Sequence, residues 1–565
     1  MTDIILALSV MFVTAGVLLL VANHFGLSPI PFYIIAGLLV GPFIALQDLV
    51  ELAQWGIAFL VFVFGIRIDF NDVQAVFRDA EVAAFVQIAV VGVFGLLVGY
   101  GFSTVYGFEY PIRNAIYFSA AATFSSTLVG AGALERDILD NLVHGRLASS
   151  IHFFDDMVAI GAILILSAAV LTDVQLITSN IGFGVLFLLA GLIFYRHGYP
   201  LLIRAAEGFD ELILMGSISI LIAFIAAAEA VGISIVIGAF AAGIAVRSEG
   251  AEAIGVQNGI ESIRDFFVAI FFVTVGALVQ LPTLEVVLIA CALLVLVLLV
   301  NPLILTVTFI FEGYDPRTSF LAGLSLNQMS ELSLIIAIQA FLLGTIADHL
   351  FDAIILTAAV TMILTVVTKR HEETIYTSYI SELFGRWQAQ YVDEHSQVED
   401  GISEHVVLVG YGRQGRQLTR LLDDLGKPCV VVENDPVLWD DLRTQCKNYV
   451  FGDAMALYTM ERANVSGATL VISTVDHGPV STSLLDLETD ADLILRANSS
   501  RKAMELLDAG ATFVTVPSVL ASDQLVENVK RLVEDEHEVV TLQNEHLDAL
   551  STLERHGFAT RFERG

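Results

Sequence analysis

Residues 147–169 read LASSIHFFDDMVAIGAILILSAA, and two adjacent carboxylates, Asp155 and Asp156, stand within this otherwise apolar run. The run has the length that an α-helix needs to cross a bilayer, which is roughly 20 residues. An ionisable side chain at that depth costs roughly 2.5 to 3.5 kcal/mol on insertion scales, and such side chains mark ion or proton pathways. The run therefore predicts a membrane protein that moves ions. A carboxylate that caps a helix or pairs with a neighbouring arginine is the structural alternative.

The composition of the whole chain agrees with a bilayer as its main solvent. Of the 565 residues, 56% are hydrophobic and only 16% are charged, and the mean hydropathy is +0.75. Average soluble domains carry about 25% charged residues. Measured against the length of a membrane-spanning helix, the sequence predicts about thirteen spans. They cover residues 4–23, 29–45, 51–67, 80–103, 112–134, 147–169, 182–203, 211–231, 233–247, 264–281, 284–311, 318–344 and 349–368.

The positive charges sort to one side of these spans. With an odd number of crossings and a cytoplasmic C-terminal part, the N-terminus lies outside. Only Arg113 of the lysines and arginines up to Arg370 then falls on the outer side. The positive-inside rule requires such a distribution. The sequence therefore predicts a multi-pass protein of the cell membrane with a cytoplasmic C-terminal domain.

The net charge excludes one class of partner. The chain has 28 Lys and Arg against 61 Asp and Glu, which gives a net charge of −33. No basic stripe is present to meet phosphates, so nucleic acid is not expected as a partner. An acidic surface with few lysines suits concentrated salt and predicts a halophilic source, with an ordinary acidic protein as the alternative.

Two further apolar runs are interrupted by polar residues. The first interruption is TFSST at residues 123–127, and the second is NQMSELS at residues 327–333. Unwound segments at corresponding places of two inverted repeats are a common way to build a midplane ion site. If the seventh span links two repeats of six, the two interruptions correspond, and we expect crossed broken helices. The hydroxyl groups alone are equally consistent with contacts between helices. The predicted ion-binding residues in these segments are Thr123, Ser126, Thr127, Gln328 and Glu331.

Several blocks of sequence carry a resemblance to a known family. They are PFYIIAGLLVGP at residues 31–42, LVFVFGI at 60–66, FSST at 124–127, the Asp155-Asp156 pair, FFVTVG at 271–276, and Gln328 with Glu331. The chain resembles the monovalent cation:proton antiporters of the Kef and bacterial sodium/proton exchanger type over almost all of residues 1–368. The resemblance implies a fold of inverted repeats with crossed broken helices.

The resemblance also assigns roles to the acidic pair. In that family the position of Asp156 carries the cation and the proton in turn, so Asp156 is predicted to bind Na⁺ or K⁺ transiently. Kef-type members usually have Gln where Asp155 stands, whereas electrogenic sodium/proton relatives have Asp or Asn there. Many relatives have a lysine on the eleventh helix that can pair with the first acid. The matching position here is Asn301, and no lysine precedes Lys369, which leaves the stoichiometry open.

The chain changes character after Lys369. The predicted organisation is a membrane domain over residues 1–368, a polar connector over 369–403, a nucleotide-binding domain over 404–533 and an acidic tail over 534–565. Within 404–533, short apolar strands alternate with amphipathic helices, which is typical of a parallel α/β sheet. The predicted fold class is thus a multi-spanning α-helical membrane domain with a C-terminal Rossmann-like domain.

A glycine motif begins this second domain. GYGRQG at residues 410–415 follows an apolar strand and opens a helix, and Glu433 ends the next strand. Strand, turn, helix and a terminal acid about 20 residues on form a dinucleotide-binding fingerprint. The glycines let backbone amides approach a phosphate, and Glu433 can accept both ribose hydroxyls. The predicted ligand contacts are Gly410, Gly412, Arg413, Gln414, Gly415 and Glu433.

Three later segments extend the motif. FGDA at residues 451–454, STVD at 473–476 and LRAN at 495–498 follow successive strands. With them, residues 404–520 resemble the TrkA-N domains that regulate potassium transport. The resemblance implies NAD(H) or an adenine nucleotide (AMP, ADP or ATP) as regulatory ligand, and a homodimer. It adds Asp453, Ala454, Thr474 and Arg496 to the expected ligand contacts.

The favoured function is secondary active exchange of Na⁺ or K⁺ for H⁺, gated by nucleotide binding. A nucleotide-gated cation channel or efflux pathway without obligatory proton exchange is the alternative. A membrane-anchored oxidoreductase is disfavoured because no His, Lys or Tyr is placed as a dehydrogenase requires, and no enzymatic activity is expected. The regulatory domain favours K⁺ and the aspartate pair favours Na⁺, so the choice of ion stays open.

Overall fold

The computed structural model describes residues 2–44, 46–67, 80–127, 130, 134, 137, 142–166, 174–206, 209–247, 253–280, 282–399, 401–534, 542–543 and 547. The chain divides into two compact units. The first comprises Met1–Ile138, His144–Thr308 and Phe320–Glu372, and the second comprises Leu139–Val143, Phe309–Ser319 and Glu373–Gly565. The acidic tail predicted from residue 534 onward lies almost wholly outside the described residues.

The first unit is built from helices. They are α1 (Thr2–Phe25), α2 (Pro29–Val40), η1 (Gly41–Phe43), α3 (Leu46–Arg67), α5 (Glu81–Val105), α6 (Pro111–Thr123), α8 (Val143–Leu166), α9 (Val174–Ile193), η2 (Phe194–Gly198), α10 (Tyr199–Ala205), α11 (Asp210–Ala230), α12 (Ile235–Ala245), α13 (Ala253–Leu278), α14 (Leu284–Val295), η3 (Leu296–Val300), α15 (Asn301–Phe311), α16 (Pro316–Leu324), α17 (Glu331–Leu342) and α18 (Asp348–Arg370). Three of them begin at a proline, which has no N–H to lose in the first turn of a helix. The ends of α15 and the start of α16 belong to the second unit.

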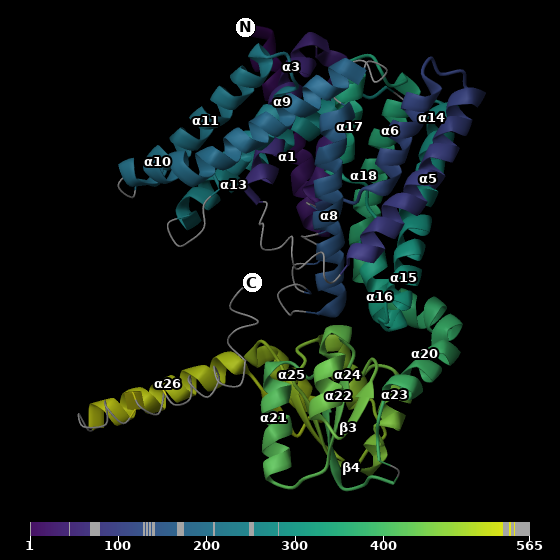
Figure 1. The fold of residues 1–565 in the computed structure, drawn as a ribbon, viewed down its shortest axis with the longest axis vertical. Coiled ribbons are helices and arrows are strands. Elements are labelled where there is room, and N and C mark those ends of the chain that lie inside the picture. Colours follow the sequence, from purple (N-terminus) through teal and green to yellow (C-terminus); the bar gives the residue numbers. More distant parts are fainter. Residues whose placement is uncertain are drawn as a thin grey trace. The chain divides into compact units, whose positions relative to one another are not determined.

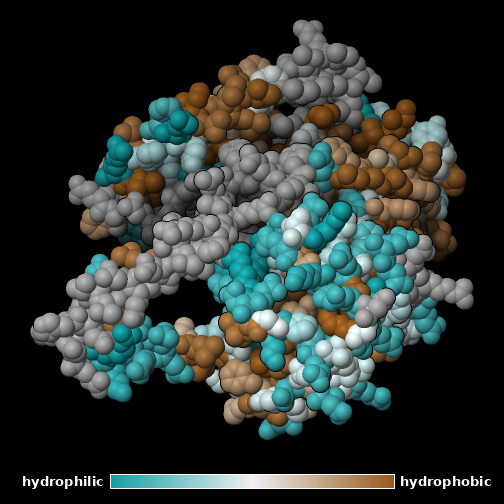
Figure 2. All heavy atoms as spheres, turned by 60° about the horizontal axis from the view of Figure 1, so that its bottom comes forward, coloured by the Kyte–Doolittle hydropathy of each residue, from teal (hydrophilic) through white to brown (hydrophobic). Residues whose placement is uncertain are grey.

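Among the described residues, seven helices are long and apolar enough to cross a membrane, and three shorter apolar helices accompany them. Their outward side chains are apolar as well: Leu20, Val105 and Leu284 are 72%, 77% and 75% exposed. Figure 2 shows apolar side chains gathered over this unit. Such a surface is stable only against lipid or another apolar partner. The helical membrane fold is therefore confirmed. The predicted span over residues 318–344 is broken into α16 and α17.

Glycines in the family-like blocks allow close helix packing. A Cβ added at Gly37 of α2 would lie 1.9 Å from the carbonyl oxygen of Val273 on α13. A Cβ added at Gly276 of α13 would lie 2.0 Å from the carbonyl oxygen of Ile34 on α2. Small residues at facing positions are how helices approach closely within a bilayer. These blocks thus hold two helix backbones against each other.

The second unit contains a six-stranded parallel sheet with the order β3-β2-β1-β4-β5-β6. The order is that of a doubly wound nucleotide-binding fold, with helices beside the sheet (Figure 1). The predicted connector is mostly helical. The elements are α19 (Glu372–Ile375), η4 (Tyr376–Ile380), α20 (Ser381–His395), β1 (His405–Val409), α21 (Arg413–Asp424), β2 (Cys429–Glu433), η5 (Pro436–Leu438), α22 (Trp439–Gln445), β3 (Asn448–Phe451), α23 (Leu457–Arg462), η6 (Val465–Gly467), β4 (Ala468–Ser473), α24 (Gly478–Leu485), β5 (Asp492–Arg496), α25 (Ser500–Asp508), β6 (Phe513–Thr515) and α26 (Pro517–Glu534).

Candidate functional site

Two unwound segments cross in the first unit. The first follows the end of α6 at Thr123, and the second lies between α16 and α17. Ser125 and Met329 form an isolated antiparallel bridge, and the amide of Ser330 donates to the carbonyl oxygen of Phe124 at 2.9 Å. The side-chain amide of Gln328 donates to the carbonyl oxygen of Ser126 at 3.1 Å. The two interruptions seen in the sequence therefore meet, as predicted for crossed broken helices.

Asp155 of α8 is fully buried beside this crossing. Its Oδ2 accepts hydrogen bonds from the amide and the hydroxyl of Ser125, at 3.0 and 2.8 Å. The same oxygen accepts a third bond from Nε2 of Gln87 on α5, at 3.2 Å. Among the described residues, no donor meets the other oxygen, Oδ1. The carboxylate thus ties α5 and α8 to the first unwound segment through one of its two oxygens.

Asp156 has different surroundings. Its Oδ2 accepts a hydrogen bond from the hydroxyl of Thr127 at 2.7 Å. Asp156 keeps 8% of its surface exposed, whereas Asp155 keeps none. Successive residues on a helix point about 100° apart. The structure therefore separates the two acids, with Asp155 inside the crossing and Asp156 beside the residues that follow it.

Some of the other predicted ion-site residues have contacts at the crossing, and two, Glu331 and Asn301, lie on or beside the helices that follow or face the second unwound segment. Thr127, Ser126 and Gln328 take part in the contacts at the crossing, and the carbonyl oxygen of Thr123 accepts a bond from Gln87 at 2.9 Å. Glu331 is fully buried at the first position of α17, directly after the helix cap Ser330. Asn301 donates to the carbonyl oxygen of Leu326 at 3.3 Å. The hydrogen bond of Asn301 thus goes to the second unwound segment and not to Asp155.

A charged cluster elsewhere in the first unit is not a good metal site. Oxygen and nitrogen atoms of Asp137, His144 and Glu372 lie close enough together to hold an ion. However, Nζ of Lys369 lies 2.5 Å from Asp137 and 2.8 Å from Glu372. The ammonium group already neutralises the negative charge that these carboxylates would offer to a metal.

The glycine motif of the second unit forms a tight turn between β1 and α21. Gly410 has a φ of +93°, which favours glycine. A Cβ added at Gly415 would lie 2.0 Å from the carbonyl oxygen of Gly410, so only glycine fits there. A Cβ added at Gly412 would meet nothing within 4 Å. Arg413 and Gln414 are exposed at the start of α21. The open space at Gly412, at a helix N-terminus, fits a phosphate group.

Glu433 lies at the end of β2, and its carboxylate contacts the glycine turn between β1 and α21. Its Oε2 accepts from the amide of Tyr411 at 2.7 Å. Its Oε1 accepts from the amides of Asn434 and Asp435, at 2.8 and 2.9 Å. Burial raises the pKa of Glu433, and the neighbouring Asp435 adds to this effect. The carboxylate therefore braces two loops in this structure, and its contact with ribose hydroxyls stays a prediction.

The remaining predicted contacts surround the same edge of the sheet. Arg496 donates to Gln414 at 3.1 Å and to the carbonyl oxygen of Thr474 at 3.2 Å. Asp453 is buried, and its Oδ1 accepts from the amide of Met455 at 3.0 Å. The side chain of Ala454 packs into a hydrophobic core of the same unit. The structure thus groups Arg496, Thr474 and Gln414 beside the turn.

Family comparison decides the identity of the larger domain. The family described as sodium/hydrogen exchanger, transmembrane, matches residues 8–370, which is well over half of the chain. The chain belongs to the sodium/hydrogen exchanger family. A TrkA-N domain matches residues 406–517 of this exchanger. Both families named by resemblance are therefore confirmed, and the exchanger is a multi-spanning membrane protein with a TrkA-N domain.

Two antiporter sequences and one solved structure are similar to most of this chain. YbaL of Escherichia coli (strain K12), named as a cation/proton antiporter, is 27% identical over 528 residues, which cover 89% of the exchanger and 93% of YbaL. KefB of Alkalimonas amylolytica, named as a K⁺ efflux antiporter, is also 27% identical. The alignment covers 88% of the exchanger and 77% of KefB. The structure of the sodium proton antiporter MjNhaP1 from Methanocaldococcus jannaschii matches with a TM-score of 0.49 at 16% identity, over 66% of the exchanger and 99% of MjNhaP1.

Sequence reasoning missed several residues of the exchanger's crossing. Gln87 is the first, although a single glutamine within the apolar run of residues 80–103 was a visible signal. Thr361 and Thr365 of α18 are others: Thr361 accepts from the amide of Met329 at 3.2 Å, and Thr365 donates to Asn327 at 2.9 Å. Their spacing of four residues places both hydroxyls on one face of a helix. That spacing could have indicated a polar partner for the second unwound segment.

Proposed function

We propose that this exchanger is a secondary active antiporter that exchanges Na⁺ or K⁺ for H⁺ across the cell membrane. Asp156 is the group that carries the cation and the proton in turn. The α/β unit lies in the cytoplasm and regulates this exchange by binding NAD(H) or an adenine nucleotide. The names of YbaL and KefB, a cation/proton antiporter and a K⁺ efflux antiporter, support the reaction class.

The observation that carries the proposal is the asymmetry of the acidic pair. Asp155 accepts three hydrogen bonds and is fully buried, while Asp156 keeps part of its surface exposed next to the hydroxyl of Thr127. A carrier must lose its proton before a cation can take its place, so it needs access to solvent. Asp155 is held too firmly for that role and positions the unwound segment instead.

One carboxylate that binds either ion is sufficient to couple two fluxes. A cation entering from one side displaces the proton from Asp156, and a proton from the other side displaces the cation. The carbonyl oxygens and hydroxyls of the unwound segments, with Thr127 and Ser126 among them, are suitable ligands for a monovalent cation. The second acid, Asp155, holds the first unwound segment beside the site through Ser125.

The nucleotide is proposed as a regulatory ligand. The open space at Gly412 supports a phosphate contact, and Arg413 and Arg496 bring positive charge to the same edge of the sheet. We expect binding without turnover, so NADH absorbance should stay constant in the presence of the purified exchanger. Falling absorbance would favour an oxidoreductase. The homodimer and the halophilic source stay predictions.

Proton movement in proteoliposomes tests the proposed exchange. A pH-sensitive dye is trapped inside, Na⁺ or K⁺ is added outside, and the wild type is compared with Asp156→Asn. Asp352→Asn is the matched control, because Asp352 is also buried and accepts its hydrogen bond from the amide of Gln280, which is not a residue of the crossing. Because cation entry is coupled to proton exit, we expect the interior to become alkaline in the wild type and the control, and no change in Asp156→Asn.

Two outcomes would contradict this mechanism. Cation flux without proton movement would favour the channel alternative, which shares the regulatory domain. Full activity in Asp156→Asn would show that another group carries the ions. The cation that drives the dye response decides between Na⁺ and K⁺.

A further inference from the structure

The link between α15 and α16, together with the first turn of α16, carries two buried charged residues. Asp315 and Arg317 are 3% and 5% exposed. The link belongs, with residues 309–319, to the same compact unit as the parallel sheet. Burying a charge costs several kcal/mol unless the charge is paired and hydrogen-bonded. The partners of these two residues therefore show what the link is built to contact.

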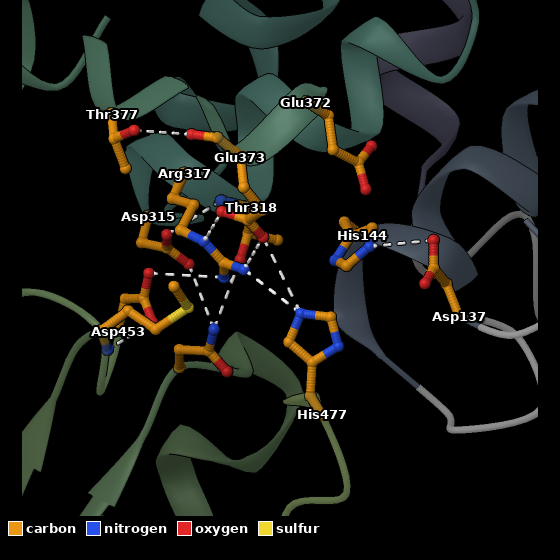
Figure 3. Close-up of polar contacts among 12 residues, drawn as sticks. Asp137, His144, Asp315, Arg317, Thr318, Glu372, Glu373, Thr377, Asp453 and His477 are labelled. Carbon is orange, nitrogen blue, oxygen red and sulfur yellow. Dashed lines mark hydrogen bonds and ion pairs between the residues drawn. The ribbon is translucent and has the colours of Figure 1, made fainter. Parts of the chain in front are cut away.

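Arg317 contacts three groups of its unit, as Figure 3 shows. Its guanidinium forms a two-point contact with the carboxylate of Glu373, in which Nε lies 3.1 Å from Oε2 and Nη2 contacts Oε1. Nη1 lies 3.5 Å from Oδ2 of Asp453, and Nη2 lies 3.5 Å from Nε2 of His477. Burial lowers the pKa of Arg317, but the carboxylates of Asp453 and Glu373 outweigh burial and raise it. Arg317 is therefore charged and shared between two carboxylates.

Asp315 connects the same link to a second strand end. Its Oδ1 accepts from the amide of Thr318 at 2.9 Å, in the first turn of α16. Its Oδ2 accepts from Nδ2 of Asn434 at 3.3 Å, and Asn434 directly follows β2. Asp453 follows β3 and His477 follows β4. The link thus contacts the carboxyl ends of three strands, which is the edge where doubly wound folds bind nucleotides.

Asp453 belongs both to the contacts of Arg317 and to the edge of the sheet where a nucleotide is expected to bind. It is a predicted nucleotide contact, and one of its oxygens faces Arg317 in this structure. We infer that a nucleotide and Arg317 compete for Asp453, and that this competition transmits nucleotide occupancy to α16. The inference rests on the proposed regulation by a nucleotide and names the residues that carry it. A hydrogen-bond donor of the nucleotide that binds Asp453 releases Arg317 toward Glu373.

The connection from Arg317 to the ion site runs along one short stretch of chain. Arg317 lies in the first turn of α16, which ends at Leu324. The unwound segment with Gln328 begins directly after that helix, and Gln328 contacts Ser126 at the crossing. A change in the contacts of a helix terminus that shifts the whole helix is an ordinary switching device.

Opposite effects of two variants on nucleotide affinity test the inference. Coupling between two sites changes affinity by about 5- to 150-fold, and the change is reciprocal. Arg317→Gln removes the competitor, so we expect AMP and NADH to bind at least 5-fold more tightly. Glu373→Gln removes the carboxylate that shares Arg317 with Asp453, so Arg317 competes more strongly for Asp453 and we expect at least 5-fold weaker binding. Affinities are measured by calorimetry on the full-length protein in detergent.

The control is Arg462→Gln, since Arg462 pairs with Asp393 at 3.3 Å and touches none of the groups above. We expect wild-type affinity for it. In proteoliposomes, nucleotide should no longer change the exchange rate of Arg317→Gln. Weaker or unchanged binding in Arg317→Gln would overturn the inference, and so would unchanged or tighter binding in Glu373→Gln. If Arg317→Gln does not fold, Glu373→Gln decides alone. If the wild type binds neither probe, the proposed regulation fails with it.

Discussion

Asp155 in the helical unit and Glu433 in the α/β unit are both buried carboxylates, and each accepts three hydrogen bonds. The donors to Asp155 are the amide and hydroxyl of Ser125 and the side chain of Gln87. The donors to Glu433 are three backbone amides, those of Tyr411, Asn434 and Asp435. Asp155 gathers its donors from two other segments, whereas Glu433 braces loops at one edge of a sheet.

The two carboxylates differ in how many of their oxygens accept these hydrogen bonds. Glu433 uses both of its oxygens, while all three donors to Asp155 meet Oδ2. Three donors on one oxygen fix the position of a carboxylate and leave its second oxygen for another partner. In the helical unit this arrangement lies next to Asp156. The same number of hydrogen bonds thus lies beside the proposed transport site in one unit and supports loops in the other.

Alanine at each position gives the largest expected difference. Asp155→Ala removes the shared acceptor of three buried hydrogen bonds, at about 1–3 kcal/mol each, so we expect the free energy of unfolding to fall by about 3 kcal/mol or more. Glu433 is 9% exposed, whereas Asp155 is fully buried, so water can reach the amides that Glu433→Ala frees and the expected loss is smaller. Thermal unfolding in detergent measures both losses. Cation-driven proton movement should vanish in Asp155→Ala and persist in Glu433→Ala.

Gln87→Leu is the matched partial variant, because it removes one of the three donors to Asp155. Its midpoint of unfolding should fall between those of the wild type and Asp155→Ala. Equal losses of unfolding free energy in Asp155→Ala and Glu433→Ala would show that the two carboxylates stabilise their units to the same extent.

Alanine at two glycines of the turn distinguishes an effect on stability from an effect on nucleotide binding, and the expected change in stability is smaller. Gly415→Ala places a Cβ 2.0 Å from a carbonyl oxygen, and such overpacking costs about 1–3 kcal/mol. Gly412→Ala meets no atom within 4 Å, so its stability should change by less than about 0.5 kcal/mol. The new methyl group nevertheless fills the space proposed for a phosphate. We expect calorimetry to find lost AMP and NADH binding in Gly412→Ala at wild-type stability. Retained binding would place the phosphate elsewhere.

A pH-dependent effect concerns a third carboxylate, Asp315. Burial, with Asp453 next, raises the pKa of Asp315 to about 6 from its ordinary 3.8. Because the folded state holds the proton more tightly, this contribution to stability is full below about pH 4 and lost as the pH rises through about 6. It amounts to no more than about 1.4 kcal/mol for each unit of pKa difference.

Asp315→Asn isolates the pH-dependent contribution of Asp315 to stability, because asparagine keeps the helix cap but does not titrate. Relative to the wild type, the variant should gain stability as the pH rises from 4 to 7. Thermal unfolding at several pH values measures that difference. A difference that is constant with pH would contradict the raised pKa.

Much of the architecture could be predicted from the sequence. The apolar runs, the two polar interruptions, the acidic pair and the glycine motif with Glu433 are all local patterns. Bilayer thickness, helix period and the needs of a tight turn act over a few to about 20 residues, so local patterns report them. The helical membrane fold and the parallel sheet followed from these patterns.

The roles within the sites were decided by tertiary structure. Gln87 and Asp155 are 68 residues apart, and Gln328 and Ser126 are 202 apart. Which of two adjacent aspartates faces Ser125 depends on the rotation of α8, and packing sets that rotation. The inward turn of Glu433 and the placement of Arg317 between Glu373 and Asp453 likewise depend on contacts between distant segments. The sequence by itself determined which chemical groups are present and in what local order, and only the packing of the chain decided which of them meet.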